Sequence, residues 1–310
     1  MTAPGGFSGA LVGPAVLGVA AYGMAGSRFR PPAGPLDQAE WAGLSRSCLG
    51  HRLVGLLAAA AAGGAVQVRN EQAAELAALE AQSAAQSRVA HRQLVQVHRE
   101  LTAEGVDHRV LDGPVLARRA YVDPNVRHYT TVDVLVEPLS PLLRRHGSNQ
   151  VRLTASLLPP SVGAPVGLSE VPEETIPIDG HAVPALPAEA QLIHACAHAT
   201  TSADAHRLLA IRDVAQLALT SALDLERLVR LAGTWRITAL VASTIQLTWA
   251  TFDLADKTPL SAWASRYDAT PAERRALLSY ADAPHRLNRA TAAALRLAGV
   301  LAAPVRRGPG

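Results

Sequence analysis

The most specific pattern in the chain is the stretch 110–137, VLDGPVLARRAYVDPNVRHYTTVDVLVE. An apolar run ends at Gly113 and Pro114, and a second apolar run, 132–136, follows a polar connection. This order predicts a strand, a turn, a helix and a buried second strand. Asp133 interrupts the second run, and a buried carboxylate is costly unless it is paired, hydrogen-bonded or bound to a cation. Asp133 is therefore the first candidate for a site residue.

The same stretch resembles a bacterial family within the nucleotidyltransferase superfamily. That family has Leu-Lys-Gly, then Tyr-x-Asp-Pro-x-x-Arg, and then a strand with two aspartates at alternate positions. The matching residues here are Leu111, Asp112, Gly113, Tyr121, Asp123, Pro124, Arg127, Thr131 and Asp133. Order and spacing agree, but the family lysine is Asp112 and the first aspartate of the pair is Thr131.

The resemblance implies a metal site, because alternate carboxylates on one strand point to one face and hold divalent ions against a nucleoside triphosphate. It implies Mg²⁺ as cofactor and a nucleoside triphosphate (NTP) as substrate or ligand. The candidates it gives are Asp133, Asp112 and Thr131 for catalysis, with Asp133 and Asp112 as metal ligands. For nucleotide binding it gives Gly113, Arg127, Tyr121, Asp123, His198 and Asp213.

Two departures weaken that implication. A threonine hydroxyl is a poor substitute for a magnesium-binding carboxylate, and an aspartate at the lysine position repels phosphate unless a metal lies between them. Two hypotheses stay open. The chain is a nucleotidyltransferase-family protein that transfers a nucleoside monophosphate to an unknown small-molecule or peptide acceptor, or it is a catalytically inactive relative that binds a nucleotide, peptide or protein as an accessory factor.

Around this stretch the sequence predicts an α+β protein: a small mixed nucleotidyltransferase-like sheet, N-terminal helices and a C-terminal helical lobe. Its 310 residues, 49% of them hydrophobic, suffice for a substantial core. The expected divisions are 1–34 (flexible or a short helix), 35–105 (helical), 106–185 (the sheet core), 186–302 (the helical lobe) and 303–310 (a disordered tail).

The expected helices and strands follow from the spacing of apolar residues and from the capping and turn residues between them. Asp37 can cap a helix that runs on through Leu53 and Leu56, and 68–103 reads as one long helix. Asp179-Gly180 predicts a two-residue hairpin. Further strands are expected at 106–111, 150–157, 174–178 and 181–183, and further helices at 141–146, 187–200, 223–232, 235–254, 270–281 and 287–301.

Other polar residues give weaker signals. His194 and His198 share a helix face, but HxxxH alone is a weak metal motif. His198, His206 and Asp213 fall where the resemblance places a helical lobe against the core, and we interpret them as a structural polar network, with cleft lining as the alternative. No third carboxylate occurs between positions 138 and 169, and Arg152 and Thr154 stand where the family has an acid and a histidine.

Composition and charge argue against a nucleic-acid-binding, exported or membrane-spanning protein. The net charge of +3 comes with a single lysine, Lys257, and no interleaving of aromatic and basic residues, so there is no strong nucleic-acid signal. The apolar run 7–25 lacks a basic start and contains Pro14, which argues against export or a membrane span. Cys48 and Cys196 are predicted to be free buried thiols, which favours a reducing, cytoplasmic location.

Overall fold

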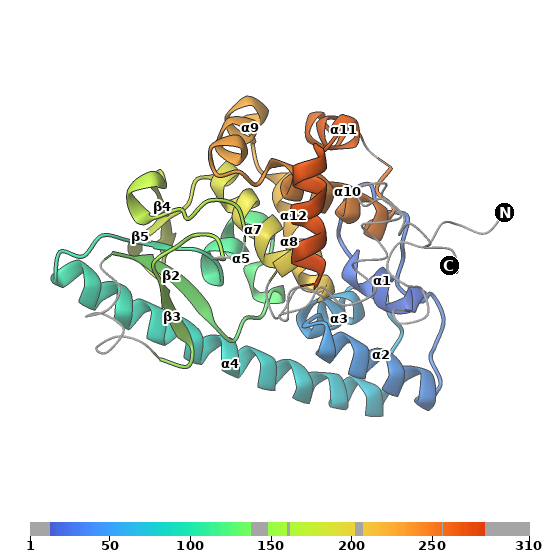
Figure 1. Cartoon of the computed structure of the whole chain (residues 1–310). Coiled ribbons are helices and arrows are strands. Elements are labelled where there is room, and N and C mark those ends of the chain that lie inside the picture. Colours follow the sequence, from blue (N-terminus) through green and yellow to red (C-terminus); the bar gives the residue numbers. More distant parts are fainter. Residues whose placement is uncertain (1–12, 138–147, 160–161, 202–206, 256, 283–310) are drawn as a thin grey trace, which may run out of the picture.

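The computed structural model describes residues 13–137, 148–159, 162–201, 207–255 and 257–282. Within these ranges the chain has eleven α-helices and one five-stranded mixed sheet, which confirms the α+β class. In Figure 1 the sheet lies at one end of the molecule, the N-terminal helices at the other, and the C-terminal helices above both.

The sheet has the strand order β3-β2-β1-β5-β4. Its strands are β1 (His108–Val110), β2 (Val132–Val136), β3 (Val151–Thr154), β4 (Glu174–Ile178) and β5 (His181–Ala185). β1 pairs antiparallel with β2 and parallel with β5, β2 pairs parallel with β3, and β4 and β5 form an antiparallel hairpin. The hairpin turns at Asp179 and Gly180, both with positive φ, as its two-residue loop requires.

The N-terminal part consists of α1 (Pro14–Ala20), α2 (Gln38–Gly50), α3 (Val54–Ala62) and α4 (Asn70–Ala103). Asp37 caps α2 through a reciprocal capping box with Glu40. The 34-residue α4 runs along one side of the molecule and connects the N-terminal helices with the sheet (Figure 1).

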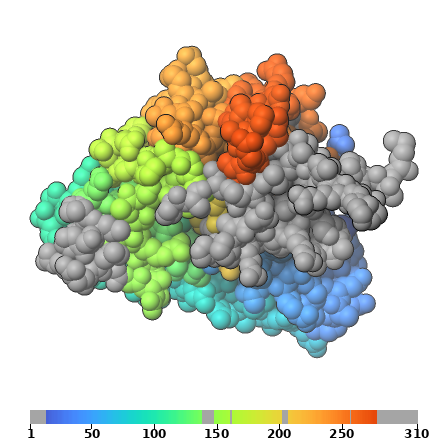
Figure 2. All heavy atoms as spheres, viewed as in Figure 1, coloured from blue at the N-terminus to red at the C-terminus, as the bar shows by residue number. Residues whose placement is uncertain are grey.

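The helix α5 (Pro114–Ala120) and the 3₁₀ turn η1 (Pro124–Val126) lie between β1 and β2, and a second 3₁₀ turn, η2 (Leu168–Glu170), precedes β4. The C-terminal lobe contains α7 (Ala188–Thr201), α8 (Leu208–Thr220), α9 (Leu225–Thr234), α10 (Thr238–Phe252), α11 (Pro259–Arg266) and α12 (Pro271–Asp282). In Figure 2 the orange and red helices of this lobe lie at the top of the view, above the green residues of the sheet region.

Alternation along β2 divides its side chains between two cores. Val132, Val134 and Val136 belong to a smaller core with Leu94 and Leu101 of α4. Leu135 belongs to the larger core that includes the lobe helices α7 and α8. Because side chains of a strand alternate, Asp133 shares the face of Leu135 and points away from α4.

Three expectations about elements are wrong or incomplete. The helix predicted from Asp37 through Leu56 breaks after Gly50, because Arg52 has φ of 59°, and Leu56 belongs to the separate helix α3. The helix predicted from 235 begins only at Thr238, after Arg236 with φ of 54°. The helix α11 was not predicted. The expected helices 141–146 and 287–301 and the tail 303–310 lie outside the described residues.

Candidate functional site

Asp112 and Asp133 lie side by side where β1 ends against β2. The backbone N–H of Asp133 donates to Oδ1 of Asp112 (2.8 Å), and the backbone N–H of Leu111 donates to the carbonyl of Asp133 (2.9 Å). The chain then turns at Gly113, whose φ of 62° and ψ of −121° start α5. The two carboxylates are thus held by main-chain geometry.

Arg152 neutralises Asp133. The two residues are direct neighbours in the parallel register of β2 and β3. Nε of Arg152 donates to Oδ1 of Asp133 (2.6 Å) and a terminal nitrogen donates to Oδ2 (2.9 Å), so one guanidinium engages both carboxylate oxygens. Such a two-point pair is the strong form of an arginine–carboxylate contact. It explains how a carboxylate is tolerated within an apolar strand.

Asp112 is the carboxylate whose pKa is changed by this arrangement. Burial and the negative charge of Asp133 raise the pKa of Asp112 to about 7, against the opposing effects of the Asp133 N–H and of Arg127 and Arg152. Close to neutral pH, Asp112 therefore exchanges between its charged and neutral forms.

The donor set does not fit a two-metal centre. Both oxygens of Asp133 are engaged by Arg152, one oxygen of Asp112 accepts a backbone N–H, and position 131 is a threonine. Among the described residues no group of three or more His, Cys, Asp or Glu side chains could hold a metal ion. Mg²⁺ in nucleotide-transfer sites is usually held by carboxylates together with phosphates, and here the carboxylates have other partners.

A second cluster joins the core to the lobe through Asp213 of α8. Arg127 donates from Nε and a terminal nitrogen to the two oxygens of Asp213 (2.9 and 2.7 Å), and the Tyr121 hydroxyl donates to Oδ1 (2.6 Å). Burial opposes the charge of Arg127, but Asp213 more than offsets it and raises the Arg127 pKa above its ordinary value. The Arg212 guanidinium lies 5.5 Å from the centre of the Tyr121 ring.

Between these clusters lies a small cavity of about 20 Å³, enough for roughly one water molecule. Its lining includes Asp112, Arg127, Gln191, His194, His198 and Asp213. Nδ1 of His194 lies 3.1 Å from the carbonyl of Leu157 and so carries the proton, which leaves Nε2 as an acceptor. Nε2 of His194 and Oε1 of Gln191 are buried without a hydrogen-bond partner among the described residues. The cavity is thus rich in acceptors.

The structure brings some of the sequence candidates together and leaves others apart. Asp112, Arg127, His198 and Asp213 line the small cavity, and Tyr121 bonds to Asp213 behind it. Thr131 precedes β2 by one residue. Asp123 lies apart from this group and caps η1 by accepting the N–H of Asn125 (2.9 Å). His206 lies outside the described residues.

Three contributors to the site were not assigned from the sequence. Arg152 was noted only as a departure from the family pattern, and its pairing with Asp133 depends on strand register. His194 was considered only as half of an HxxxH motif. Gln191 carried no signal of its own, although its side-chain amide donates to the carbonyl of Leu111 (2.5 Å) and fixes α7 against the end of β1.

The five-stranded mixed sheet thus places one carboxylate, Asp112, just after β1 and another, Asp133, within β2. Residues 37–144 match the model of a protein family described as "Uncharacterised nucleotidyltransferase". The match covers α2 to β2 and confirms the family resemblance read from the motifs of that region. Neither curated proteins nor solved structures gave a match to this chain.

Two further sequence expectations can be compared with the structure. Cys48 and Cys196 are free and buried, as predicted, and burial raises the pKa of Cys48 to about 12. Among the described helices, none combines the length and the apolar character that crossing a membrane requires.

Proposed function

We propose that this chain is a nucleotidyltransferase-like binding protein that has lost metal-dependent nucleotidyl transfer. The observation that carries the proposal is the two-point contact between Arg152 and Asp133. The guanidinium supplies the positive charge that a cation would otherwise bring to this carboxylate. The ion pair of Arg152 with Asp133 then serves to stabilise the strand pair β2–β3.

Two substitutions point the same way. Asp112 stands where the family has a lysine, and Thr131 stands where it has the first aspartate. In a two-metal transfer the ions neutralise charge on the attacked phosphorus, so loss of one carboxylate of the pair lowers the rate more than it weakens binding. Asp112 and Thr131 fit a folded core, but they do not supply the charges that metal-dependent nucleotidyl transfer requires.

Calorimetric titration with Mg²⁺ in the presence of a nucleoside triphosphate tests the proposal. After the heat of Mg²⁺ binding to the nucleotide alone is subtracted, we expect no magnesium-dependent heat in the wild type and none in Asp133→Asn. Arg152→Ala is the comparison variant in the same titration, because without the guanidinium both oxygens of Asp133 are free to bind a cation. A magnesium-dependent signal in the wild type that Asp133→Asn removes would overturn the proposal.

A second candidate is an active enzyme with a rebuilt site. It is favoured by one observation: Asp112 and Asp133 lie close enough for the charge of Asp133 to raise the pKa of Asp112, and a divalent cation would relieve that repulsion. In that case Asp112 and Asp133 would hold Mg²⁺ with a nucleoside triphosphate, and the acceptor would be a small molecule or a peptide. Wild-type magnesium binding in the same titration would support this alternative.

A further inference from the structure

The C-terminal end of α4 meets the sheet through a cluster of three histidines and one arginine. His98 and Arg99 lie on α4, His108 is the first residue of β1, and His181 is the first residue of β5. Nδ1 of His98 lies 2.9 Å from Nε2 of His108, and a terminal nitrogen of Arg99 lies 2.8 Å from Nε2 of His181. The ring centroids of His98 and His181 are 6.1 Å apart. These four residues, the histidine clasp, join α4 to two neighbouring strands of the sheet.

The partners of the clasp fix the tautomer of each ring. Nδ1 of His108 lies 3.0 Å from the backbone carbonyl of Val106, which can only accept, so this nitrogen carries the proton and Nε2 is an acceptor. Nδ1 of His98 then donates to Nε2 of His108. Arginine can only donate, so Nε2 of His181 is an acceptor as well. All three rings are therefore neutral, with the proton on Nδ1.

A further proton breaks two of these contacts. In His108 and His181 the lone pair on Nε2 already accepts a hydrogen bond, so a proton there turns the acceptor into a second donor. In His181 it also places a charged ring against the guanidinium of Arg99. His98 keeps its bond to His108 when its own Nε2 is protonated, but it then carries a charge in a buried position.

The surroundings of the two buried rings oppose their protonation. Burial and the other three members of the clasp lower the pKa of His98 from 6.5 to about 4. Burial also lowers the pKa of His108, against the opposing effects of the Val106 carbonyl and of Asp107 and Glu173. Both of these carboxylates form ion pairs with Arg109, whose own charge disfavours a proton on His108.

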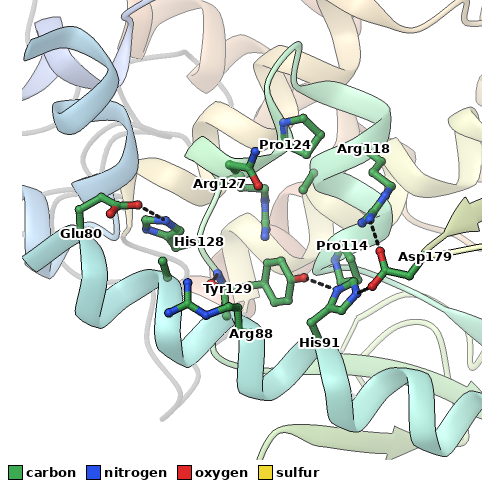
Figure 3. A pocket seen from close by; sticks show the side chains of 14 residues that line it. Glu80, Arg88, His91, Pro114, Arg118, Pro124, Arg127, His128, Tyr129 and Asp179 are labelled. Carbon is green, nitrogen blue, oxygen red and sulfur yellow. Dashed lines mark hydrogen bonds and ion pairs between the residues drawn. The ribbon is translucent and has the colours of Figure 1, made fainter. Parts of the chain in front are cut away.

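A histidine two turns earlier on α4 has the opposite response. Nε2 of His91 lies 2.5 Å from Oδ2 of Asp179 in the β4–β5 turn, and Nδ1 lies 3.0 Å from the Tyr129 hydroxyl (Figure 3). A protonated His91 still donates to this carboxylate, and the hydroxyl can accept the second ring proton. The hydrogen bond from His91 lowers the pKa of Asp179, whose charge also acts on His181, and Arg118 donates to its other oxygen (3.0 Å). This contact therefore persists in acid.

We infer that the histidine clasp is a pH-sensitive contact, closed while its rings are neutral and released by protonation, and that the His91–Asp179 contact holds the hairpin turn to α4 in both states. The released form binds more protons than the closed form, because the pKa of His98 is lowered in the closed form. The stabilisation by the clasp is therefore present above pH 6.5 and is lost as the pH falls towards 4. The clasp uses none of the residues on which the proposed loss of transfer activity depends.

Amide hydrogen exchange of the full chain tests the release, when it is read by mass spectrometry and corrected for the intrinsic pH dependence of exchange. We expect the protection of residues 97–110 to be at least about tenfold lower at pH 4.5 than at pH 7. Residues 74–88 of the same helix and the lobe helix α10 should keep their protection. NMR of the ring nitrogens at pH 7 should show the proton on Nδ1 in all three histidines of the clasp.

Glutamine variants keep the hydrogen bonds but take up no proton. His98→Gln with His108→Gln retains a donor and an acceptor between these positions, and His181→Gln retains an acceptor for Arg99. The triple variant should lose the pH response, and His181→Gln alone, at a half-buried position, should weaken it even if the triple variant fails to fold. His91→Gln, on the same face of α4, is the matched control and should respond as the wild type does.

Four results would overturn the inference. They are unchanged protection of residues 97–110 between pH 7 and pH 4.5, a loss of protection there that α10 shares, a full pH response in both His181→Gln and the triple variant, and clasp rings that carry their proton on Nε2 at pH 7.

Discussion

The backbone N–H of Asp133 donates to the side-chain oxygen Oδ1 of Asp112 over 2.8 Å, so the two carboxylates are tied through the main chain. Asp133 is neutralised from the other side by Arg152. Asp112 accordingly contributes a charge whose state depends on pH near neutrality. Asp133 contributes an ion pair with Arg152.

Replacement of Asp112 by Asn should stabilise the protein selectively at high pH. The pKa of Asp112 is raised to about 7 in the folded state from an ordinary value of 3.8, so the native form binds more protons between these values. Its contribution to the free energy of unfolding therefore falls as pH rises through this window. Urea denaturation should show Asp112→Asn gaining stability relative to wild type at pH 8 compared with pH 5. A difference independent of pH would contradict this assignment.

His194 should have the opposite pH dependence. Burial lowers its pKa from 6.5 to about 4, so the unfolded chain binds the extra proton and stability falls as pH drops from 6.5 to 4. A shift of this size corresponds to roughly 3 kcal/mol. We expect His194→Gln to lose less stability than wild type between pH 7 and pH 4.5 in denaturant titrations. Equal losses in the two proteins would show that His194 is not the responsible group.

Removal of Asp213 should be strongly destabilising. Asp213→Ala leaves the buried Arg127 guanidinium without its partner, which costs about 3–5 kcal/mol in comparable sites. Asp268→Ala is the matched control, because its ion pair with Arg274 (3.0 Å) is exposed and should be worth less than about 1 kcal/mol. Similar unfolding free energies for the two variants would argue against the Asp213 cluster as the connection between core and lobe.

Glycine at position 113 is required by the turn into α5. A Cβ there would lie 2.8 Å from Cγ2 of Val132, and φ is 62°. Gly113→Ala should lower the free energy of unfolding by about 1–3 kcal/mol. Gly43→Ala in α2, where a Cβ meets nothing within 4 Å, should instead raise it by about 0.5–1 kcal/mol. Thermal unfolding of the pair measures both effects, and a neutral Gly113→Ala would contradict the proposed constraint.

Residue types and their local spacing were enough to predict several elements of the fold. The Val-Asp-Val-Leu-Val run predicted β2 with its observed bounds, and Asp179-Gly180 predicted the hairpin through the positive φ that both residues adopt. The break between α2 and α3 was missed because the residue with positive φ is Arg52, which carries no turn signal. Sequence reasoning detects helix ends best where glycine or proline marks them.

The site was less predictable, because its contacts join residues far apart in the chain. Asp133 was identified as a carboxylate that needs a partner, but the partner is set by the register of β2 and β3, 19 residues apart. Arg127 and Asp213 are separated by 86 residues, and only the packing of α8 against the core brings them together. Such pairings require tertiary geometry, which residue types in one sequence do not specify.

The loss of metal-dependent transfer is tested most directly by release of labelled pyrophosphate from nucleoside triphosphates with Mg²⁺ and candidate acceptors. The wild type, Asp133→Ala and a double variant, Thr131→Asp with Asp112→Lys, are compared. We predict the same background release from wild type and Asp133→Ala, and an increase only in the double variant, which restores the family residues at positions 112 and 131. Pyrophosphate release by the wild type that Asp133→Ala abolishes would contradict the account and show that the site is an active one.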